Sequence, residues 1–163
     1  MMTQWCAKAF AELSTEQLYQ ILQLRQQVFV VEQDCVYLDA DGLDQQALHL
    51  FAMTQGQVVA CCRVLPPGVK YPEPSIGRVC TAQTQRRSGL GRELMQTALA
   101  LCAERYPSVR ESPLATAVAS VADSSVRISA QLYLQNFYAS FGFITVSDVY
   151  DEDGIPHIEM LHG

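Results

Sequence analysis

The sequence predicts one domain of the α/β class, in an α+β arrangement with helices flanking a sheet, over residues 1–163. Its 163 residues are 49% hydrophobic, which suffices for a single core. Three strand-like runs follow one another at residues 47–54, 57–65 and 76–81, which predicts an antiparallel meander. Helical patterns precede and follow that meander, so helices are expected to cover the sheet.

The chain before the meander predicts a strand over residues 3–10 and then a helix. Ser14 and Gln17 have the spacing of a capping box, in which each side chain bonds the other's backbone N–H. The apolar face of this helix carries Leu18, Ile21, Leu22, Val28 and Phe29. Arg25 falls on the same face, so its guanidinium either extends to solvent or pairs with a carboxylate.

An acidic loop follows this helix around Gly42. Its four aspartates are Asp34, Asp39, Asp41 and Asp44. A calcium loop with Gly42 in the sixth position would need ligands at Tyr37 and Leu48, and neither can serve, so that possibility is excluded. Two interpretations stay open, namely a solvated acidic loop and an acidic rim that faces a cationic substrate.

The meander and the segments after it have clear boundaries. Gln55 and Gly56 predict a tight hairpin, and prolines keep residues 66–74 extended. A helix should follow residue 89, because Leu90, Leu94, Ala98 and Leu101 share one face. Residues 108–125 have no clear period and are expected to be an insertion.

The C-terminal part predicts a strand at residues 126–130, a helix at 130–141 and a strand at 143–150. Gly142 is expected to end that helix in a left-handed conformation. Asp153 and Gly154 predict a turn into a last strand over residues 155–161.

The turn before the helix at residue 90 has the features of an anion site. Arg86, Gly89 and Gly91 precede free N–H groups and the positive end of a helix dipole. A nucleotide-triphosphate loop is excluded because no Gly-Lys-Ser/Thr triplet follows these glycines. A dinucleotide fingerprint is excluded because Leu94 stands where its third glycine belongs.

Composition limits the partners. The net charge of −6 argues against a general nucleic-acid binder. No segment is long and apolar enough for a membrane span and no signal pattern opens the chain, so we expect a cytoplasmic protein without a membrane partner. The six cysteines lack metal-ligand spacing and are expected to be free buried thiols, and no metal is expected.

Two sets of motifs carry a resemblance to a known family. Arg86-x-x-Gly89-x-Gly91 and the segment 136–143, Asn-Phe-Tyr-Ala-Ser-Phe-Gly-Phe, resemble the GCN5-related N-acetyltransferase (GNAT) superfamily. Residues 24–33, 37–42, 76–79, 134–138 and 153–158 resemble, more narrowly, the ElaA family of bacterial acetyltransferases. The resemblance covers nearly the whole chain and implies a GNAT-type domain with a mixed central sheet. Residues 108–125 depart from it, because this connection is shorter in the family.

The resemblance implies an N-acyltransferase that carries acetyl from acetyl-CoA to a small-molecule or peptide amine in a ternary complex. The implied cofactor-binding residues are Val79, Cys80, Thr81, Arg86, Arg87, Ser88, Gly89, Leu90, Gly91, Arg92 and Asn136. The strand 79–81 would polarise the thioester carbonyl through a backbone N–H and pair with the pantetheine arm.

Catalytic and acceptor residues follow from the same resemblance. Tyr138 takes the position of the general acid that protonates the leaving thiolate. Glu32 and His157 are alternative bases for the amine, acting directly or through water, although a structural role for His157 is equally possible. The expected acceptor-binding residues are Arg25, Phe29, Asp41 and Arg78.

Two other residues are expected to be structural, and two other functions remain open. His49 lies on an apolar strand, and Cys80 has no evident activating base. A non-catalytic acyl-CoA sensor would keep the glycine turn without needing Tyr138. An acyl-homoserine-lactone synthase would share the fold and an Arg-x-x-x-Phe pattern, here Arg25 to Phe29. The chain is expected to be a monomer or homodimer, and the acceptor's identity stays open.

Overall fold

The computed structural model describes residues 2–107 and 125–163. The expected insertion at 108–125 lies outside the described residues except for Ser125. The strands and α-helices are β1 (Gln4–Ala9), α1 (Thr15–Gln26), β2 (Leu48–Thr54), β3 (Gln57–Leu65), β4 (Ser75–Thr81), α2 (Leu90–Arg105), β5 (Val126–Gln131), α3 (Gln135–Ala139), β6 (Ile144–Thr145), β7 (Tyr150–Glu152) and β8 (Ile155–His162). A π-helical segment, η2 (Gln27–Glu32), extends α1, and short 3₁₀ turns are η1 (Phe10–Glu12), η3 (Asp44–Gln46), η4 (Gln83–Gln85) and η5 (Leu132–Leu134).

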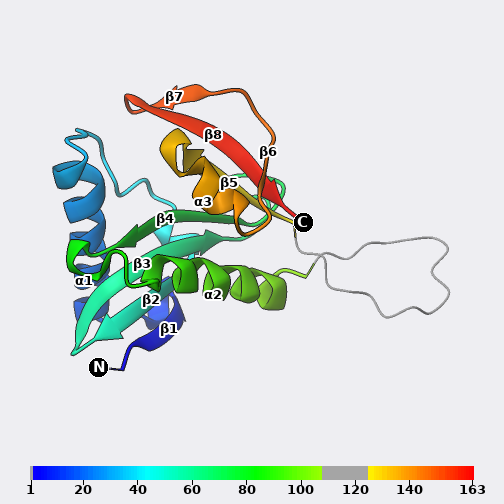
Figure 1. Cartoon of the computed structure of the whole chain (residues 1–163). Coiled ribbons are helices and arrows are strands. Elements are labelled where there is room, and N and C mark those ends of the chain that lie inside the picture. Colours follow the sequence, from blue (N-terminus) through cyan, green and yellow to red (C-terminus); the bar gives the residue numbers. More distant parts are fainter. Residues whose placement is uncertain (1, 108–124) are drawn as a thin grey trace, which may run out of the picture.

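The sheet is mixed, as the sequence predicts. Its strand order is β1-β2-β3-β4-β5-β8-β6, and β7 pairs with β8 (Figure 1). The meander β2-β3-β4 is antiparallel, as expected, and β1 extends it antiparallel to β2. The β4–β5 pairing is parallel, whereas β5, β6 and β7 all pair antiparallel to β8.

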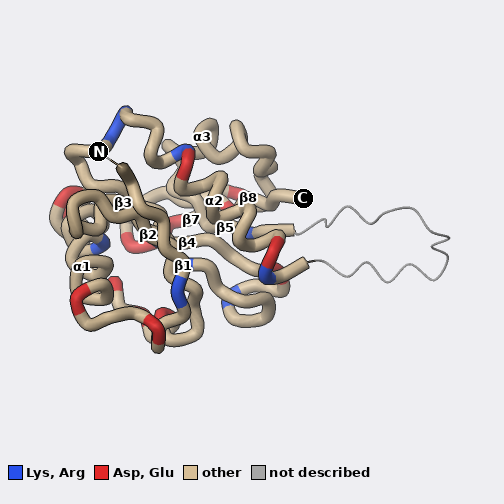
Figure 2. Tube along the Cα trace, turned by 90° about the horizontal axis from the view of Figure 1, so that it is seen from below, with Lys and Arg blue, Asp and Glu red and all other residues tan. Residues whose placement is uncertain are grey.

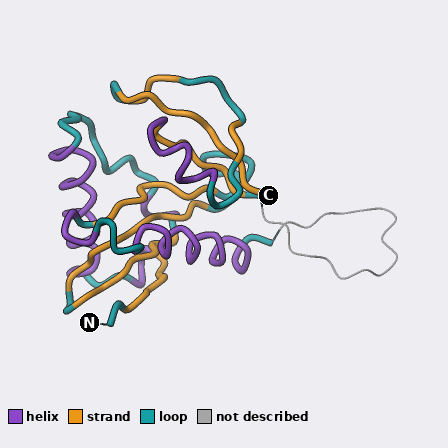
Figure 3. The backbone as a smooth tube through the Cα atoms, viewed as in Figure 1, coloured by secondary structure: helices purple, strands orange, loops and turns teal. Residues whose placement is uncertain are grey.

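Helices cover both faces of this sheet, which makes a three-layer fold (Figure 3). Alternate residues of β2 face opposite helices, because Phe51 packs in a cluster with Ile21 and Leu24 of α1, whereas Leu50 packs with Leu94 of α2. Tyr138 of α3 belongs to the α2 cluster as well. Acidic positions, red in Figure 2, gather around α1.

Local sequence signals fix the ends of several elements. Ser14 Oγ accepts from the Gln17 amide and Gln17 Oε1 accepts from the Ser14 amide, so the predicted capping box is confirmed. The Gln55–Gly56 and Asp153–Gly154 hairpins are also confirmed. Both residues of each pair have positive φ, between 52° and 80°, which the twist of a two-residue hairpin turn requires.

Two C-terminal predictions are wrong in extent. The helix predicted at 130–141 is a 3₁₀ turn followed by α3, because β5 runs on to Gln131, where it pairs with His157. In place of the single strand predicted at 143–150, the structure has two short strands, β6 and β7. Between them Ser147 leaves the strand path, and its Oγ accepts from the Glu159 amide. A side chain thus satisfies a donor that a continuous strand would have bonded.

Candidate active site

The candidate site lies where the two central parallel strands separate. β4 and β5 pair only at Ser75 and Arg127. Beyond that point a cavity of about 920 Å³ has walls from β4, β5, η2, α3 and the β7–β8 hairpin. Figure 1 shows β4 and β5 diverging toward the end where α2 begins. A ligand entering here can reach backbone groups that are paired in an ordinary sheet.

A β-bulge in β4 shapes one wall of this cavity. Gly77 pairs with Arg63 and Cys80 pairs with Cys61, so β4 has one residue more than β3 between these pairs. Arg78, within the bulge, has φ of 51°, which is unfavourable for a side chain of this size. The bulge turns the backbone of Arg78 and Val79, and both residues line the cavity.

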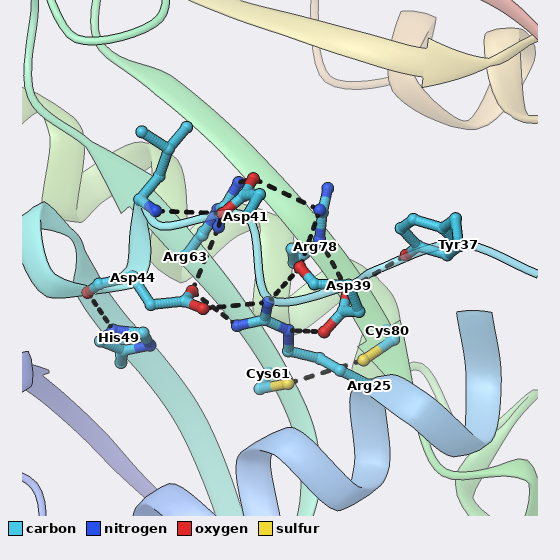
Figure 4. Close-up of polar contacts among 11 residues, drawn as sticks. Arg25, Tyr37, Asp39, Asp41, Asp44, His49, Cys61, Arg63, Arg78 and Cys80 are labelled. Carbon is cyan, nitrogen blue, oxygen red and sulfur yellow. Dashed lines mark hydrogen bonds and ion pairs between the residues drawn. The ribbon is translucent and has the colours of Figure 1, made fainter. Parts of the chain in front are cut away.

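A buried ion-pair network holds this bulge from behind (Figure 4). Arg78 Nε donates to Asp39 Oδ1 at 2.8 Å, and Arg25 Nε donates to Asp39 Oδ2 at 2.8 Å. Arg25 also reaches Asp44 at 2.7 Å. Arg63 pairs with Asp44 and Asp41. Arg25 is only 1% exposed, and Asp39 is 5% exposed.

The charges of this network stabilise one another. Burial disfavours the charged form of Asp44, but hydrogen bonds from Arg25 and the charge of Arg63 outweigh it, so the pKa of Asp44 is lowered. The pKa of Asp41 is lowered in the same way, mainly by Arg63 against the cost of burial. Both aspartates therefore remain ionised at neutral pH.

Three aspartates of the acidic loop do not fit either of the two surfaces that the sequence allowed. Asp39 and Asp44 are buried, and Asp41 pairs with Arg63 and Arg78, so these three carboxylates form no solvated loop and no free rim for a substrate. Arg25 does not line the cavity, although it was expected in the acceptor site, and Asp41 lines only a second hollow that adjoins the cavity. Phe29 and Arg78 do line it. The sequence signal for the network was Arg25 on an apolar helix face. The sequence could not say which carboxylate pairs with Arg25.

The glycine-rich turn lies at the α2 end of the cavity. Gly89 immediately precedes α2 with φ of 90°, and a Cβ placed on it would meet nothing within 4 Å. The Oγ of Ser88 donates to the Gln85 carbonyl and accepts from the Leu90 amide, which fixes the turn. Arg92 and Glu93 amides both return to the Gly89 carbonyl. The surface over Gly89 is thus open to a close approach by an anion.

Most of the predicted cofactor-binding residues lie around this cavity. The wall includes Val79, Cys80, Thr81, Arg86, Arg87, Gly89, Gly91 and Arg92. It does not include Ser88, Leu90 or Asn136. Leu90 is buried in the core, Ser88 supports the turn, and Asn136 lies exposed on α3. Asn136 is thus not part of the cavity wall.

Tyr138 lies on the cavity wall from α3. It is 6% exposed and packs edge-on against Phe137 and Phe143. Its hydroxyl makes no hydrogen bond within residues 2–107 and 125–163, so it can donate to a ligand. Burial raises the pKa of Tyr138, with Cys62, Tyr133 and Cys80 as smaller causes, so the hydroxyl keeps its proton at neutral pH.

The two candidate bases have different surroundings. Arg86 Nη2 donates to Glu32 Oε2 at 2.6 Å, so that carboxylate is already paired. His157 Nδ1 lies 2.7 Å from the Ile155 carbonyl, which can only accept, so Nδ1 carries the proton. Nε2 then has a free lone pair. Both residues line the cavity, but only His157 offers an unoccupied base in its neutral form.

Three further polar residues at the His157 end escaped the sequence analysis. Glu152 Oε2 lies 3.8 Å from His157 Nε2 and accepts from Ser129 Oγ at 3.0 Å. The Tyr150 hydroxyl also bonds Ser129, and its ring stacks on that of His157. They belong to β5 and the β7–β8 hairpin, and no sequence motif links those elements.

The side chains of Cys80 and His49 are buried, as expected. Cys80 is 5% exposed with its sulfur 3.5 Å from that of Cys61, and a hydrogen bond to Cys61 together with burial raises its pKa, so its thiol is unreactive. His49 is 2% exposed, and its Nε2 lies 2.9 Å from the Asp44 carbonyl.

Within the described residues no group of three His, Cys, Asp or Glu side chains could hold a metal ion, and no described helix is long and apolar enough to cross a membrane.

The model of the acetyltransferase (GNAT) domain matches residues 12–162. The chain belongs to the GNAT acetyltransferase family. It is 43% identical to a UPF0039 protein of Synechocystis, over 96% of this chain and 93% of that protein. It is 40% identical to the protein ElaA of Escherichia coli, over 98% of this chain and 95% of that one. Within the GNAT family the chain is therefore an ElaA homologue.

Several solved structures have the same architecture. An acyl-CoA N-acyltransferase from Pseudomonas aeruginosa superposes with a TM-score of 0.86 at 38% identity, covering 99% of this chain and 100% of that one. Escherichia coli ElaA superposes with a TM-score of 0.85, at the same identity and coverage. The acyl-homoserine lactone synthase BjaI, at 15% identity and a TM-score of 0.72, shares the fold alone.

Proposed function

We propose that this protein transfers an acetyl group from acetyl-CoA to a small-molecule or peptide amine by direct attack. The observation that carries this proposal is the cavity between β4 and β5, which joins an open glycine turn with three arginines to a free tyrosine hydroxyl and a free imidazole nitrogen. An anion site and a proton-transfer site in one cavity suit a long donor that carries phosphates at one end and a reactive thioester at the other.

The residues at the turn fit a pyrophosphate. Arg86, Arg87 and Arg92 supply positive charge, and the N-terminus of the 16-residue helix α2 supplies N–H groups and a dipole. Because Gly89 would place no side chain in the way, the backbone can contact the phosphate oxygens directly. Arg86 would exchange Glu32 for phosphate when the donor binds.

The bulge in β4 provides a backbone donor for the negative charge that develops on the thioester oxygen. Acyl transfer places negative charge on the thioester oxygen, and a fixed backbone N–H is an effective donor there. The bulge frees ladder positions at Arg78 and Val79, so the strand 79–81 can both pair with the pantetheine arm and polarise the carbonyl. The network behind Arg78 keeps that donor fixed.

Proton transfers are assigned to His157 and Tyr138. An ammonium ion has no lone pair, so His157 Nε2 takes one proton from the acceptor before its nitrogen attacks the thioester carbon. The C–N bond forms and the C–S bond breaks. The Tyr138 hydroxyl gives a proton to the departing sulfur and is reprotonated by the second proton that the new amide nitrogen loses, so CoA leaves as the thiol and His157 keeps the first proton. Glu32 ranks second as base because Arg86 already holds one of its oxygens.

The test is the release of free CoA from acetyl-CoA with and without an amine. A panel of alkylamines, polyamines, amino acids and peptides is the source of acceptors. We expect CoA release to depend on the amine and the product mass to equal that of the amine plus one acetyl group. A non-catalytic sensor would bind acetyl-CoA and release no CoA with any amine, and a lactone synthase would give a cyclic product of different mass.

A further inference from the structure

Charged side chains of different sign are prominent at the two ends of the cavity. The α2 end carries Arg86, Arg87 and Arg92. The hairpin end carries Glu152 and Asp153. Among the described residues, no lysine or arginine forms an ion pair with either of these two carboxylates. Three arginines therefore lie where the cavity would hold phosphates, whereas Glu152 and Asp153 lie at the hairpin end, where Lys70 is also part of the wall.

A second hollow, of about 500 Å³, continues the cavity outward at the acidic end. It shares Tyr37, Lys70, Arg78, Glu152 and Asp153 with the main cavity. The charge of Arg78 is neutralised there by Asp39 and Asp41. Lys70 is exposed and also lines both the hollow and the main cavity, with its ammonium 5.4 Å from the centre of the Tyr71 ring. An acceptor entering by this hollow meets the carboxylates of Glu152 and Asp153 and the ammonium of Lys70.

Glu152 is oriented by neighbours on two sides. Ser129 Oγ donates to its Oε2, and Ser129 is itself bonded to Tyr150. The same Oε2 lies 3.8 Å from His157 Nε2, so one ammonium group can contact both atoms. A carboxylate that binds the ammonium beside a neutral imidazole keeps the nitrogen close to the base that must deprotonate it.

We propose that Glu152 is the acceptor-binding residue, and that the acceptor is a small primary amine with no carboxylate next to its amino group. This inference rests on the proposed N-acyltransferase function. Ser129 and Tyr150 are positioning residues that hold Glu152. A carboxylate beside the amino group would lie in the field of Glu152 and Asp153, and it would lose affinity by repulsion.

The experiment compares steady-state kinetics for n-butylamine, 1,4-diaminobutane, glycine and L-alanine in the wild type and in Glu152→Gln. We expect the two amines without a carboxylate to have the lower KM in the wild type. Glu152→Gln should raise the KM for n-butylamine roughly tenfold, because a charge-assisted hydrogen bond becomes neutral, while the KM for acetyl-CoA stays within about twofold. Glu152→Asp should recover part of the loss.

Asp148→Asn is the matched control, because Asp148 is an exposed carboxylate in the β6–β7 connection and does not line the cavity. An unchanged n-butylamine KM in Glu152→Gln would overturn the assignment, as would a rise of the same size in Asp148→Asn. A lower KM for glycine than for n-butylamine, lost in Lys70→Gln, would overturn the amine class. If the wild type releases no CoA with any of the amines, the proposed function itself fails. That result differs from the outcomes that overturn the assignment of Glu152.

Discussion

Tyr138 brings a protonated hydroxyl to the cavity wall without giving it a partner in the protein. Burial among Phe137 and Phe143 raises the pKa of Tyr138, so its hydroxyl is neutral at neutral pH. A thiol has a reference pKa of about 8.5, so the thiolate of CoA is a weaker base than the tyrosinate of Tyr138. The hydroxyl is therefore best suited to donate a hydrogen bond to sulfur as the C–S bond breaks.

Tyr138→Phe removes this donor and leaves the packing of the ring. We expect kcat to fall about 100-fold or more, because the thiolate then leaves unassisted, while the KM for acetyl-CoA changes little. Steady-state kinetics at saturating donor measures the effect. A kcat equal to that of the wild type would show that Tyr138 only packs.

The two candidate bases can be separated by their pH profiles. His157→Gln should lower kcat/KM for the amine roughly 100-fold and remove the acidic limb of its pH profile, because no neutral imidazole remains to accept the proton. Glu32→Gln should keep that limb and change mainly the KM for acetyl-CoA, since it frees Arg86. The opposite pattern, with the limb lost only in Glu32→Gln, would make Glu32 the base.

At the scale of elements, the bulge in β4 depends on a loop distant in sequence. Arg78 adopts a left-handed backbone conformation that costs free energy, and Asp39 holds both its side chain and that of Arg25. A buried ion pair gives little net stability when complete, but losing one partner leaves an uncompensated charge. The network thus fixes the bulge geometry more than it adds stability.

Asp39→Asn tests this dependence. We expect it to lower the free energy of unfolding by roughly 3 kcal/mol, because Arg25 and Arg78 lose a buried counter-charge while Asp44 still pairs with Arg25. The kcat should also fall, because the bulge amide is no longer fixed. Asp34→Asn is the control, since Asp34 is an exposed aspartate of the same loop. Equal urea midpoints for the two variants would contradict the role of the network.

Elements with local signals were predictable and the site was only partly so. The capping box at Ser14 and the hairpins at Gly56 and Gly154 depend on neighbouring residues, so the sequence reveals them. The partners of Arg25 are 14 and 19 residues away in the sequence. Glu152 of β7 accepts a hydrogen bond from Ser129 of β5, although the two residues belong to different strands. Register alone brings such residues together, and no spacing in the sequence encodes it.

At the scale of the whole molecule, the buried charges make stability depend on pH. Burial lowers the pKa of His49 in the folded state, partly against its bond to the Asp44 carbonyl. Its neutral form therefore contributes stability above the unfolded pKa of about 6.5, and this is lost as pH falls below that value. Asp41 and Asp44, whose pKa values are also lowered, contribute above about pH 4 and lose that contribution below it.

The free energy of unfolding should accordingly fall in two stages between pH 7 and pH 3. Urea denaturation at half-unit intervals of pH measures both stages. His49→Gln should remove most of the upper stage, because the buried imidazole is gone, and leave the lower stage in place. A profile that is flat between pH 7 and pH 5 in the wild type would contradict the buried neutral histidine.

The central claim is that the glycine turn at the start of α2 holds the acyl donor. Gly91→Val places a branched side chain at this surface, where a Cβ would meet only Thr81 Cγ2, at 3.9 Å. The fold should tolerate it, so the loss should fall on binding. Gln96→Val is the control, because it makes a β-branched substitution on an exposed position of α2.

The decisive measurement is the rise in melting temperature caused by saturating acetyl-CoA, which depends on ligand concentration over Kd. We predict a clear rise in the wild type and in Gln96→Val, and a rise reduced by more than half in Gly91→Val. An undiminished rise in Gly91→Val, or none in the wild type, would show that the donor does not bind at this turn.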